Sequence, residues 1–286
     1  MSTDIASLAD SIRRLREKTG AGMTECKKAL TEADNDFEKA VETLRKKGLA
    51  DAAKRSARTT KEGLVASYIS PDGKTGAIVE LNCETDPVAK TDEFRDLAAM
   101  LAKAAAEGKL ASVAAAEPLV KEAALKLREN MGLKRFERFA LSGAGKIACY
   151  IHSAGSKKGS MLEFSASTDA VAAHEAVSGL ARELGMQVVA MGPRWVKRTD
   201  VPPAEIAKEK DIYEAQVRKE GKPEASIAKI VEGKLNKLFY QAFCLSEQMS
   251  MRDNKTPMSK LVEDAGKAAG GSVEIKRFVR YQLGGE

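Results

Sequence analysis

The sequence predicts an α+β fold in which one small subdomain occurs twice, after a short helical domain and around an inserted helical hairpin. Two observations show the repeat. The segment 81–89, LNCETDPVA, returns as 164–172, FSASTDAVA, where Thr-Asp-x-Val-Ala is shared at an offset of 83. The apolar pattern of 133–141 returns at 275–283 with an offset of 142. A third observation is that the N-terminal residues show only helical periodicity.

The two offsets locate an insertion, because the second exceeds the first by 59 residues. The extra residues must lie between the helix and the last strand of the second copy. The predicted domains are an N-terminal three-helix domain at 1–50, a linker at 51–62, a first core subdomain at 63–142, a second core subdomain at 143–192 and 245–286, and an inserted hairpin at 193–244.

The N-terminal domain is predicted from three short helical patterns. Its first helix repeats apolar residues at helical spacing and ends at the glycine-rich turn 19–22. Thr24 is expected to cap the second helix, and Asn35 with Glu38 resembles a capping box for the third, which Gly48 should end. Helices this short bury little surface, so we expect a docking module.

The linker carries four basic residues and no apolar stripe. These are Lys54, Arg55, Arg58 and Lys61. The simpler interpretation is a solvated linker. The alternative is a basic strip that contacts RNA or an acidic partner, as in an RNA-binding translation accessory protein.

Each core copy begins with a hairpin and continues into a helix. In the first copy, Pro71-Asp72-Gly73 is the turn between two strands with antiparallel pairing. Thr85 and Asp86 have the chemistry of helix N-caps, and Pro87 suits the first helical position. The next helix should bury Phe94, Leu97, Ala98 and Leu101 on one face, and a last strand closes each copy.

The sequence of the insertion predicts two antiparallel helices. Pro202-Pro203 opens the first, and Gly221-Lys222-Pro223 turns the chain. The apolar stripes are Ile206, Tyr213 and Val217 on the first helix, and Ile227, Ile230, Val231, Leu235 and Leu238 on the second. Two interpretations stay open: the seam is purely internal, or the hairpin protrudes and meets another chain.

Composition favours a binding protein over an enzyme. The net charge of +6 permits an acidic partner but does not require nucleic acid. Four scattered cysteines, no secretory signal and no membrane-spanning apolar run fit reduced thiols in the cytoplasm. Cys149 and His152 should point to opposite faces of a strand, and Gly143-Ala144-Gly145-Lys146 lacks the rest of a phosphate loop. No catalytic residue, metal site or cofactor is predicted.

The segment from Leu15 to Leu30, LREKTGAGMTECKKAL, together with Leu81–Asp86 and Glu232-Gly233-Lys234, closely resembles translation elongation factor Ts. The resemblance covers nearly the whole chain. It implies a guanine nucleotide exchange factor for elongation factor Tu, with a ubiquitin-associated-like (UBA-like) N-terminal domain and a coiled-coil hairpin. It also implies a wedge, in which the Thr-Asp-Phe-Val segment of the factor disturbs the Mg²⁺ site of the GTPase.

The resemblance assigns partner contacts residue by residue. The wedge falls on Thr85, Asp86, Pro87 and Val88, with Asp86 as its aspartate. The other contacts fall on Arg16, Met23, Lys27, Leu127, Arg128, His152 and Met251. Without the resemblance, Met23 could belong to the core of its own domain, Lys27 would be one of many solvated lysines, and Asp86 would be only a helix cap.

Pro87 departs from the family pattern, because it stands where the wedge has phenylalanine. A buried phenylalanine contributes roughly 1.5–3 kcal/mol, so exchange is weaker here or neighbouring contacts compensate. The hairpin is a candidate for homodimerisation or a 2:2 complex. No membrane is expected among the partners, and direct contact with nucleic acid is not expected either.

Overall fold

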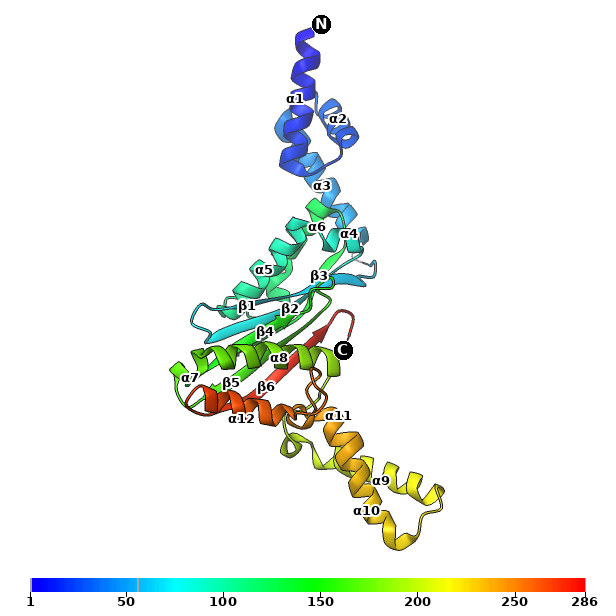
Figure 1. Cartoon of the computed structure of the whole chain (residues 1–286). Coiled ribbons are helices and arrows are strands. Elements are labelled where there is room, and N and C mark those ends of the chain that lie inside the picture. The colour runs from blue at the N-terminus through cyan, green and yellow to red at the C-terminus, as the bar shows by residue number, and fades with distance from the viewer. Residues whose placement is uncertain (1, 56, 286) are drawn as a thin grey trace. The chain divides into compact units, whose positions relative to one another are not determined.

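The computed structural model describes residues 2–55 and 57–285, and the side chains of 8–48, 55 and 57–285 (Figure 1). It is a mixture of helices and two small sheets, as the predicted α+β class requires. The chain forms two compact units. The first comprises Met1–Leu64, Val79–Leu101 and Leu110–Phe136, and the second comprises Val65–Ile78, Ala102–Lys109 and Glu137–Glu286.

The N-terminal part of the first unit contains the three predicted helices, α1 (Ser2–Thr19), α2 (Met23–Glu32) and α3 (Phe37–Arg55). Their shared core includes Leu15, Cys26, Leu30 and Leu44. The predicted stop at Gly48 is wrong, because α3 continues to Arg55 and takes up part of the predicted linker. Glycine inside a helix costs only about 1 kcal/mol, and Gly48 does not adopt the left-handed φ of a helix end.

The helix caps also differ from the prediction. The α2 helix begins one residue before Thr24, and its N-cap Gly22 donates its backbone N–H to Glu25 (3.2 Å). The cap of α3 is Asp36 rather than Asn35, since Asp36 Oδ1 accepts the N–H groups of Glu38 and Lys39 (both 3.1 Å). Glu25 therefore binds the N–H of the N-cap of α2, whereas Asp36 satisfies two free donors in the first turn of α3.

The first sheet has the order β1 (Glu62–Ile69), β2 (Thr75–Cys83), β3 (Met131–Ala140) and contributes to both units. Between β2 and β3 lie α4 (Asp86–Ala89), α5 (Asp92–Ala106), the 3₁₀ turn η1 (Ala114–Ala116) and α6 (Glu117–Leu127). The predicted buried face of α5 is confirmed, with Phe94 and Leu101 fully buried.

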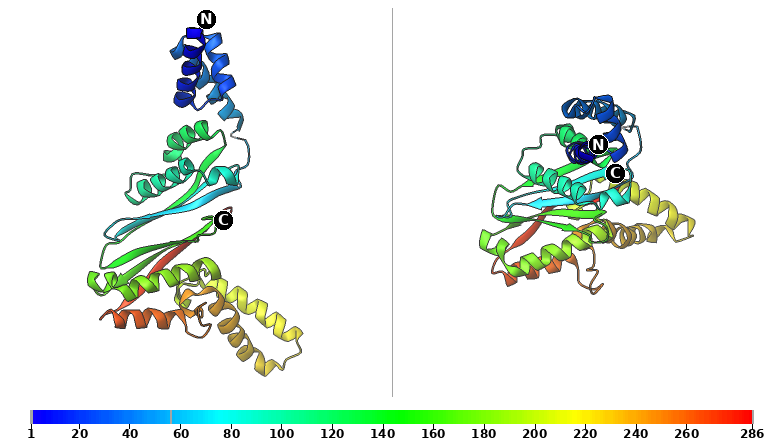
Figure 2. Two further views of the ribbon diagram at one scale, coloured as in Figure 1. Left: turned by 45° about the horizontal axis from the view of Figure 1, so that its top comes forward. Right: turned by 90° about the horizontal axis from the view of Figure 1, so that it is seen from above.

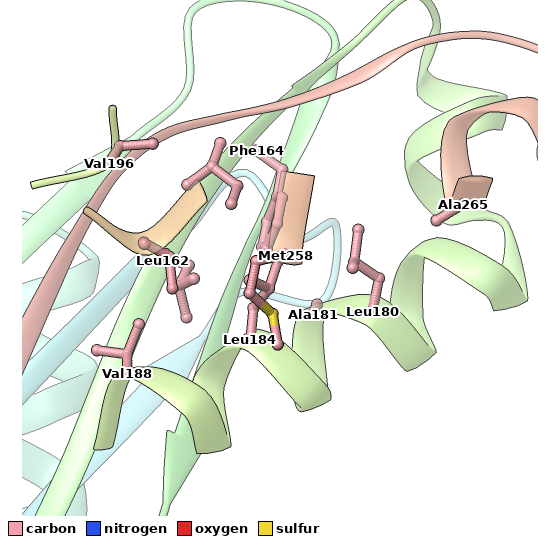
Figure 3. Packing of buried hydrophobic residues seen from close by; sticks show 11 residues of the cluster. Leu162, Phe164, Leu180, Ala181, Leu184, Val188, Val196, Met258 and Ala265 are labelled. Carbon is pink, nitrogen blue, oxygen red and sulfur yellow. The ribbon is translucent and has the colours of Figure 1, made fainter. Parts of the chain in front are cut away.

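The second sheet is antiparallel and has the order β4 (Gly145–Ile151), β5 (Lys158–Ala166), β6 (Val273–Gln282). The helices α7 (Asp169–Ala173) and α8 (Glu175–Met191) follow β5, and α12 (Met258–Ala268) precedes β6. Both α8 and α12 cover the same face of this sheet (Figure 1, Figure 2). Phe164 and Leu162 of β5 pack there against Leu184 of α8 and Met258 of α12 (Figure 3).

Within the second unit, the other face of this sheet also buries apolar residues. Ile147 and Met161 join Val65 of β1 and Ile78 of β2 in one core cluster. The turn 70–74 accepts two backbone hydrogen bonds, from the Leu141 N–H to Lys74 O (2.9 Å) and from the N–H of Ile147 in β4 to Gly73 O (2.8 Å).

The two copies share one backbone feature at the start of their hairpins. Gly63 and Gly145 have φ values of 141° and 153°. A Cβ on Gly63 would lie 2.1 Å from the carbonyl oxygen of Leu81, and a Cβ on Gly145 would lie 2.1 Å from that of Phe164. Only glycine allows this backbone approach, so the repeated glycines are fixed by geometry in both copies.

The insertion contains η2 (Arg198–Asp200), α9 (Pro203–Lys219), α10 (Glu224–Lys234), the π-helix η3 (Leu235–Tyr240) and α11 (Gln241–Phe243). Its ends meet where Arg194 and Trp195 donate backbone N–H groups to Phe243 O (2.8 and 3.1 Å). A short 3₁₀ turn, η4 (Leu245–Glu247), leads back to the sheet domain.

One predicted seam residue of the insertion, Leu238, is 51% exposed. The wider π turn rotates the chain, so Phe239 and Tyr240 enter the buried cluster with Leu235 instead. The other predicted seam positions of α9 and α10 lie in or against that cluster. In the described part of the chain, no helix has the length and apolarity needed to cross a bilayer.

Candidate functional site

The segment after β2 forms a short exposed helix, α4, at the predicted wedge position. Thr85 and Pro87 are exposed, Val88 is half-buried, and the Asp86 side chain is 38% exposed. Asp86 is paired with Lys90 one turn later (2.5 Å). The helix begins at Asp86, so Pro87 occupies its second position and not the predicted first one. The segment is therefore available at the surface of the first unit.

Thr85 does not cap this helix with its side chain, contrary to the prediction. Its hydroxyl donates to the Glu129 carboxylate, which also accepts the backbone N–H groups of Glu84 and Thr85 (both 3.1 Å). The chain just before β3 thus holds the chain just after β2.

In a second set of contacts, the chain just after β2 provides the acceptor and the chain just before β3 provides the donor. Glu84 accepts the backbone N–H of Asn130 (2.6 Å) and the Arg58 guanidinium (3.3 Å). These contacts lower the pKa of Glu84, the Asn130 hydrogen bond most of all. The Asn130 side chain in turn donates to Arg58 O (2.7 Å). Arg58, one of the basic linker residues, is therefore engaged in an ion pair inside the first unit.

Arg16, Met23 and Lys27 lie on α1 and α2 and are all exposed. Met23 is 62% exposed, so the interpretation that it belongs to the core of its own domain is wrong. A methionine at the surface is a flexible apolar contact, and Lys27 and Arg16 add positive charge nearby in the sequence.

Leu127 and Arg128 lie at the end of α6, in the same unit. Leu127 is half-buried, whereas Arg128 is exposed and adopts the left-handed conformation that ends the helix (φ 59°). The Arg128 guanidinium forms an ion pair with Glu25 of α2, which also binds Lys47 (3.1 Å). Arg128, then Lys47 and the Gly22 N–H, lower the pKa of Glu25 from 4.5 to about 2.

This ion pair predicts a pH-dependent part of the stability. Because the folded pKa of Glu25 is below its unfolded value, its contribution is complete above pH 4.5 and is lost as the pH falls through about 2. We expect Glu25→Gln to lower the free energy of unfolding at pH 7 by about 1–2 kcal/mol, after allowance for partial solvent screening.

Urea unfolding of Glu25→Gln and of the unsubstituted protein between pH 2 and 7 measures this difference in the free energy of unfolding. The two curves should converge toward pH 2, and Glu17→Gln, at an exposed position of α1, serves as the control. A constant difference between Glu25→Gln and the unsubstituted protein at every pH would contradict the assignment.

The remaining two predicted contacts, His152 and Met251, lie in the second unit. His152 follows β4, is exposed, and shares a hydrogen bond between its Nδ1 and the Tyr150 hydroxyl (3.0 Å). Tyr150 packs against Gly185 of α8, where an added Cβ would lie 2.6 Å from Tyr150 Cβ. This contact places the end of β4 beside the C-terminal half of α8.

Met251 is 51% exposed on a loop that buried polar groups hold against α8. Gln187 of α8 accepts the backbone N–H of Met251 (3.0 Å) and donates to Gln248 (3.2 Å) and Met249 O (3.1 Å). Gln187 and Gln248 are almost completely buried. The irregular stretch that contains Met251 is thus a firmly held loop.

Sequence reasoning missed Glu129, Asn130, Gln187 and Gln248. Glutamine at the apolar face of α8 was a usable signal, because a buried amide needs several partners. Glu129 and Asn130 gave no such signal, since an acidic and an amide residue before a strand are ordinary on a surface.

The described residues contain no group of three or more His, Cys, Asp or Glu side chains that could hold a metal ion. Burial raises the pKa of Cys83 and of Cys149 to about 12, so these thiols stay protonated and are poor nucleophiles. The geometry therefore offers exposed side chains next to backbone that buried or distant polar groups hold by hydrogen bonds.

Comparisons with known proteins identify relatives that are translation elongation factors. The family model described as "Elongation factor TS" matches residues 84–285. An elongation factor Ts of Clostridium botulinum (strain Alaska E43 / Type E3) is 43% identical over 96% of this chain and 92% of its own length. That of Nitratidesulfovibrio vulgaris (strain DP4) is 41% identical, over 98% of this chain and 96% of its own.

Proposed function

Because the chain belongs to the elongation factor Ts family, we propose that it is a guanine nucleotide exchange factor that binds elongation factor Tu and promotes GDP release. Membership confirms the resemblance seen in the sequence and makes the chain a translation elongation factor, not an enzyme. The proposal places its action in the cytoplasm.

The single observation that best supports this proposal is the exposed α4 segment on its fixed base. Asp86 and Pro87 are presented by a four-residue helix, while the two residues before them are bound by Glu129 and Asn130. A surface group on a rigid base can enter a partner without first paying the entropy of ordering a loop.

The proposed mechanism is displacement of the surroundings of the partner's Mg²⁺ and phosphates by this segment. Mg²⁺ requires near-ideal octahedral coordination, so small shifts of its neighbours weaken its binding. By linkage, binding of the exchange factor lowers the affinity of the GTPase for nucleotide. Nucleotide lowers the affinity of the GTPase for the exchange factor by the same ratio. Shifting the GTPase from 1:99 to 99:1 in favour of its nucleotide-releasing state takes about 5.5 kcal/mol of differential binding free energy. Several contacts must therefore act together.

The other contacts that we propose are Arg16, Met23 and Lys27 on the N-terminal helices, Leu127 and Arg128 at the end of α6, and His152 and Met251 in the second unit. Their exposure supports this, except for half-buried Leu127. We also propose that α1–α3 form a UBA-like domain and that α9 and α10 form a coiled coil. A homodimer or 2:2 complex through the hairpin stays a prediction.

The test is stopped-flow release of a fluorescent GDP analogue from elongation factor Tu. Addition of micromolar factor with excess unlabelled GDP should accelerate release by orders of magnitude. No acceleration would reject the proposal. A steeply salt-dependent affinity for RNA, measured in parallel, would instead support the RNA-binding alternative.

Pro87→Phe is expected to release GDP at the same rate as the unsubstituted factor or faster. Pro87 is exposed at the second position of α4, and a phenylalanine that becomes buried in the partner adds up to about 1.5–3 kcal/mol. Pro118→Phe is a matched control, because Pro118 is also exposed near the start of a helix, α6. Loss of exchange in Pro87→Phe alone would show that proline itself is required.

A further inference from the structure

We infer that Glu129 is a positioning residue for exchange: its carboxylate holds the turn that presents Asp86. This inference rests on the proposed function. Glu129 would contact neither the partner nor its nucleotide. It would act through the backbone of Glu84 and Thr85, which it binds directly.

The contact is specific in its geometry. One carboxylate oxygen accepts both backbone N–H groups at 3.1 Å, and the other accepts the Thr85 hydroxyl. Hydrogen bonds to an ionised acceptor are about twice as strong as neutral ones. Since α4 has only four residues, its own hydrogen bonds cannot fix its direction, so the direction of Asp86 depends on this anchor.

The second copy of the repeat provides an internal comparison. With the offset of 142 that relates the last strands, Glu129 corresponds to Gly271, which has no side chain. A Cβ at Gly271 would lie 2.2 Å from Ser167 Oγ and 2.7 Å from Val171 Cγ2, so a side chain there would displace both neighbours. The equivalent turn is held instead by neutral hydrogen bonds between Ser167 and Ser272 (3.0 and 3.2 Å).

The threonines of the two copies differ accordingly. Thr168 caps its own helix, because its Oγ1 accepts the N–H of Val171 (3.2 Å). Thr85 makes no such cap and gives its hydroxyl to Glu129. The first copy thus lacks the local helix cap of the second copy and has the Glu129 carboxylate as an anchor instead. The first copy is also the one whose aspartate falls on the wedge position.

The experiment compares Glu129→Ala and Glu129→Gln with the unsubstituted factor in two assays. The first is amide hydrogen exchange of the free factor at Glu84 and Thr85. The second is GDP release from elongation factor Tu, analysed as a maximal rate and a half-saturating factor concentration. Glu122→Ala is the matched control, because Glu122 is an exposed glutamate of α6 paired only with Lys126 among the described residues.

In Glu129→Ala, the Thr85 amide should exchange at least about tenfold faster, because it loses its acceptor. The maximal rate of GDP release should fall at least about tenfold, while the half-saturating concentration changes less than about threefold, since the other contacts remain. Glu129→Gln should be intermediate, because its amide oxygen can still accept the two backbone N–H groups. Glu122→Ala should match the unsubstituted factor in both assays.

Unchanged hydrogen exchange in Glu129→Ala would overturn the anchor itself. Faster hydrogen exchange with unchanged GDP release would overturn its role in positioning. If the unsubstituted factor does not accelerate release, the proposed function fails, and the hydrogen-exchange assay still reports on the anchor. Should Glu129→Ala not fold, Thr85→Val removes only the hydroxyl donor, and a smaller drop in maximal rate is then expected.

Discussion

Asp86→Ala is expected to reduce the acceleration of GDP release by about 10- to 100-fold, which corresponds to one lost charged hydrogen bond of about 1.5–3 kcal/mol. The aspartate is the only carboxylate within α4 and lies next to exposed Pro87. Its pair with Lys90 is solvent-exposed and adds little to stability. The variant should therefore unfold at nearly the same urea concentration as the unsubstituted factor.

Asp169→Ala is the control for this prediction, because Asp169 is the equivalent aspartate of the second copy. It pairs with Lys74 and accepts the backbone N–H of Gly145 (3.3 Å), both in its own unit. We expect a small loss of stability and no loss of exchange. Equal exchange defects in Asp86→Ala and Asp169→Ala would show that the first copy has no special role.

Gly145→Ala is expected to destabilise the protein by about 3 kcal/mol or more. The new Cβ would lie 2.1 Å from Phe164 O, and a φ of 153° is unfavourable for alanine. The start of β4 would have to move away from β5, where Gly145 faces Ser165. Urea or thermal unfolding of the purified variant measures the loss.

Gly143→Ala is the matched control, two residues away in the same turn. Apart from its own chain neighbours, no described atom lies within 4 Å of its added Cβ, and its φ is outside the left-handed region. We expect a change within about 0.5 kcal/mol of zero. If both alanine variants were equally stable, the close backbone approach at Gly145 would not exist in solution.

Much of the fold could be predicted from the sequence because the repeat carries its own period. The two hairpins, the buried face of α5, the last strand of each copy and the pair of helices between α8 and α12 all follow from repeated residues and their spacing. Errors arose where a local preference was overridden. Gly48 does not end α3, and Leu238 leaves the seam because a π turn changes the period.

The candidate site could be predicted only as a set of residues. The resemblance named Asp86, Met23 and Met251, and the structure shows that Met23 and Met251 are exposed. The resemblance could not name the side chains that hold the backbone near Asp86 and Met251 in place. Glu129 and Gln187 act through contacts 44 and 64 residues away in the chain, which have no local pattern.

The sequence alone determined the duplicated α+β plan, the inserted hairpin and the family, since these depend on period, spacing and motif. Only the tertiary structure decided what becomes of equivalent residues in the two copies. Thr168 caps a helix, whereas Thr85 is bound by Glu129, because Gly271 and Glu129 occupy the same place before the last strand. A side chain's role depends on which distant group meets it, and folding brings those groups together.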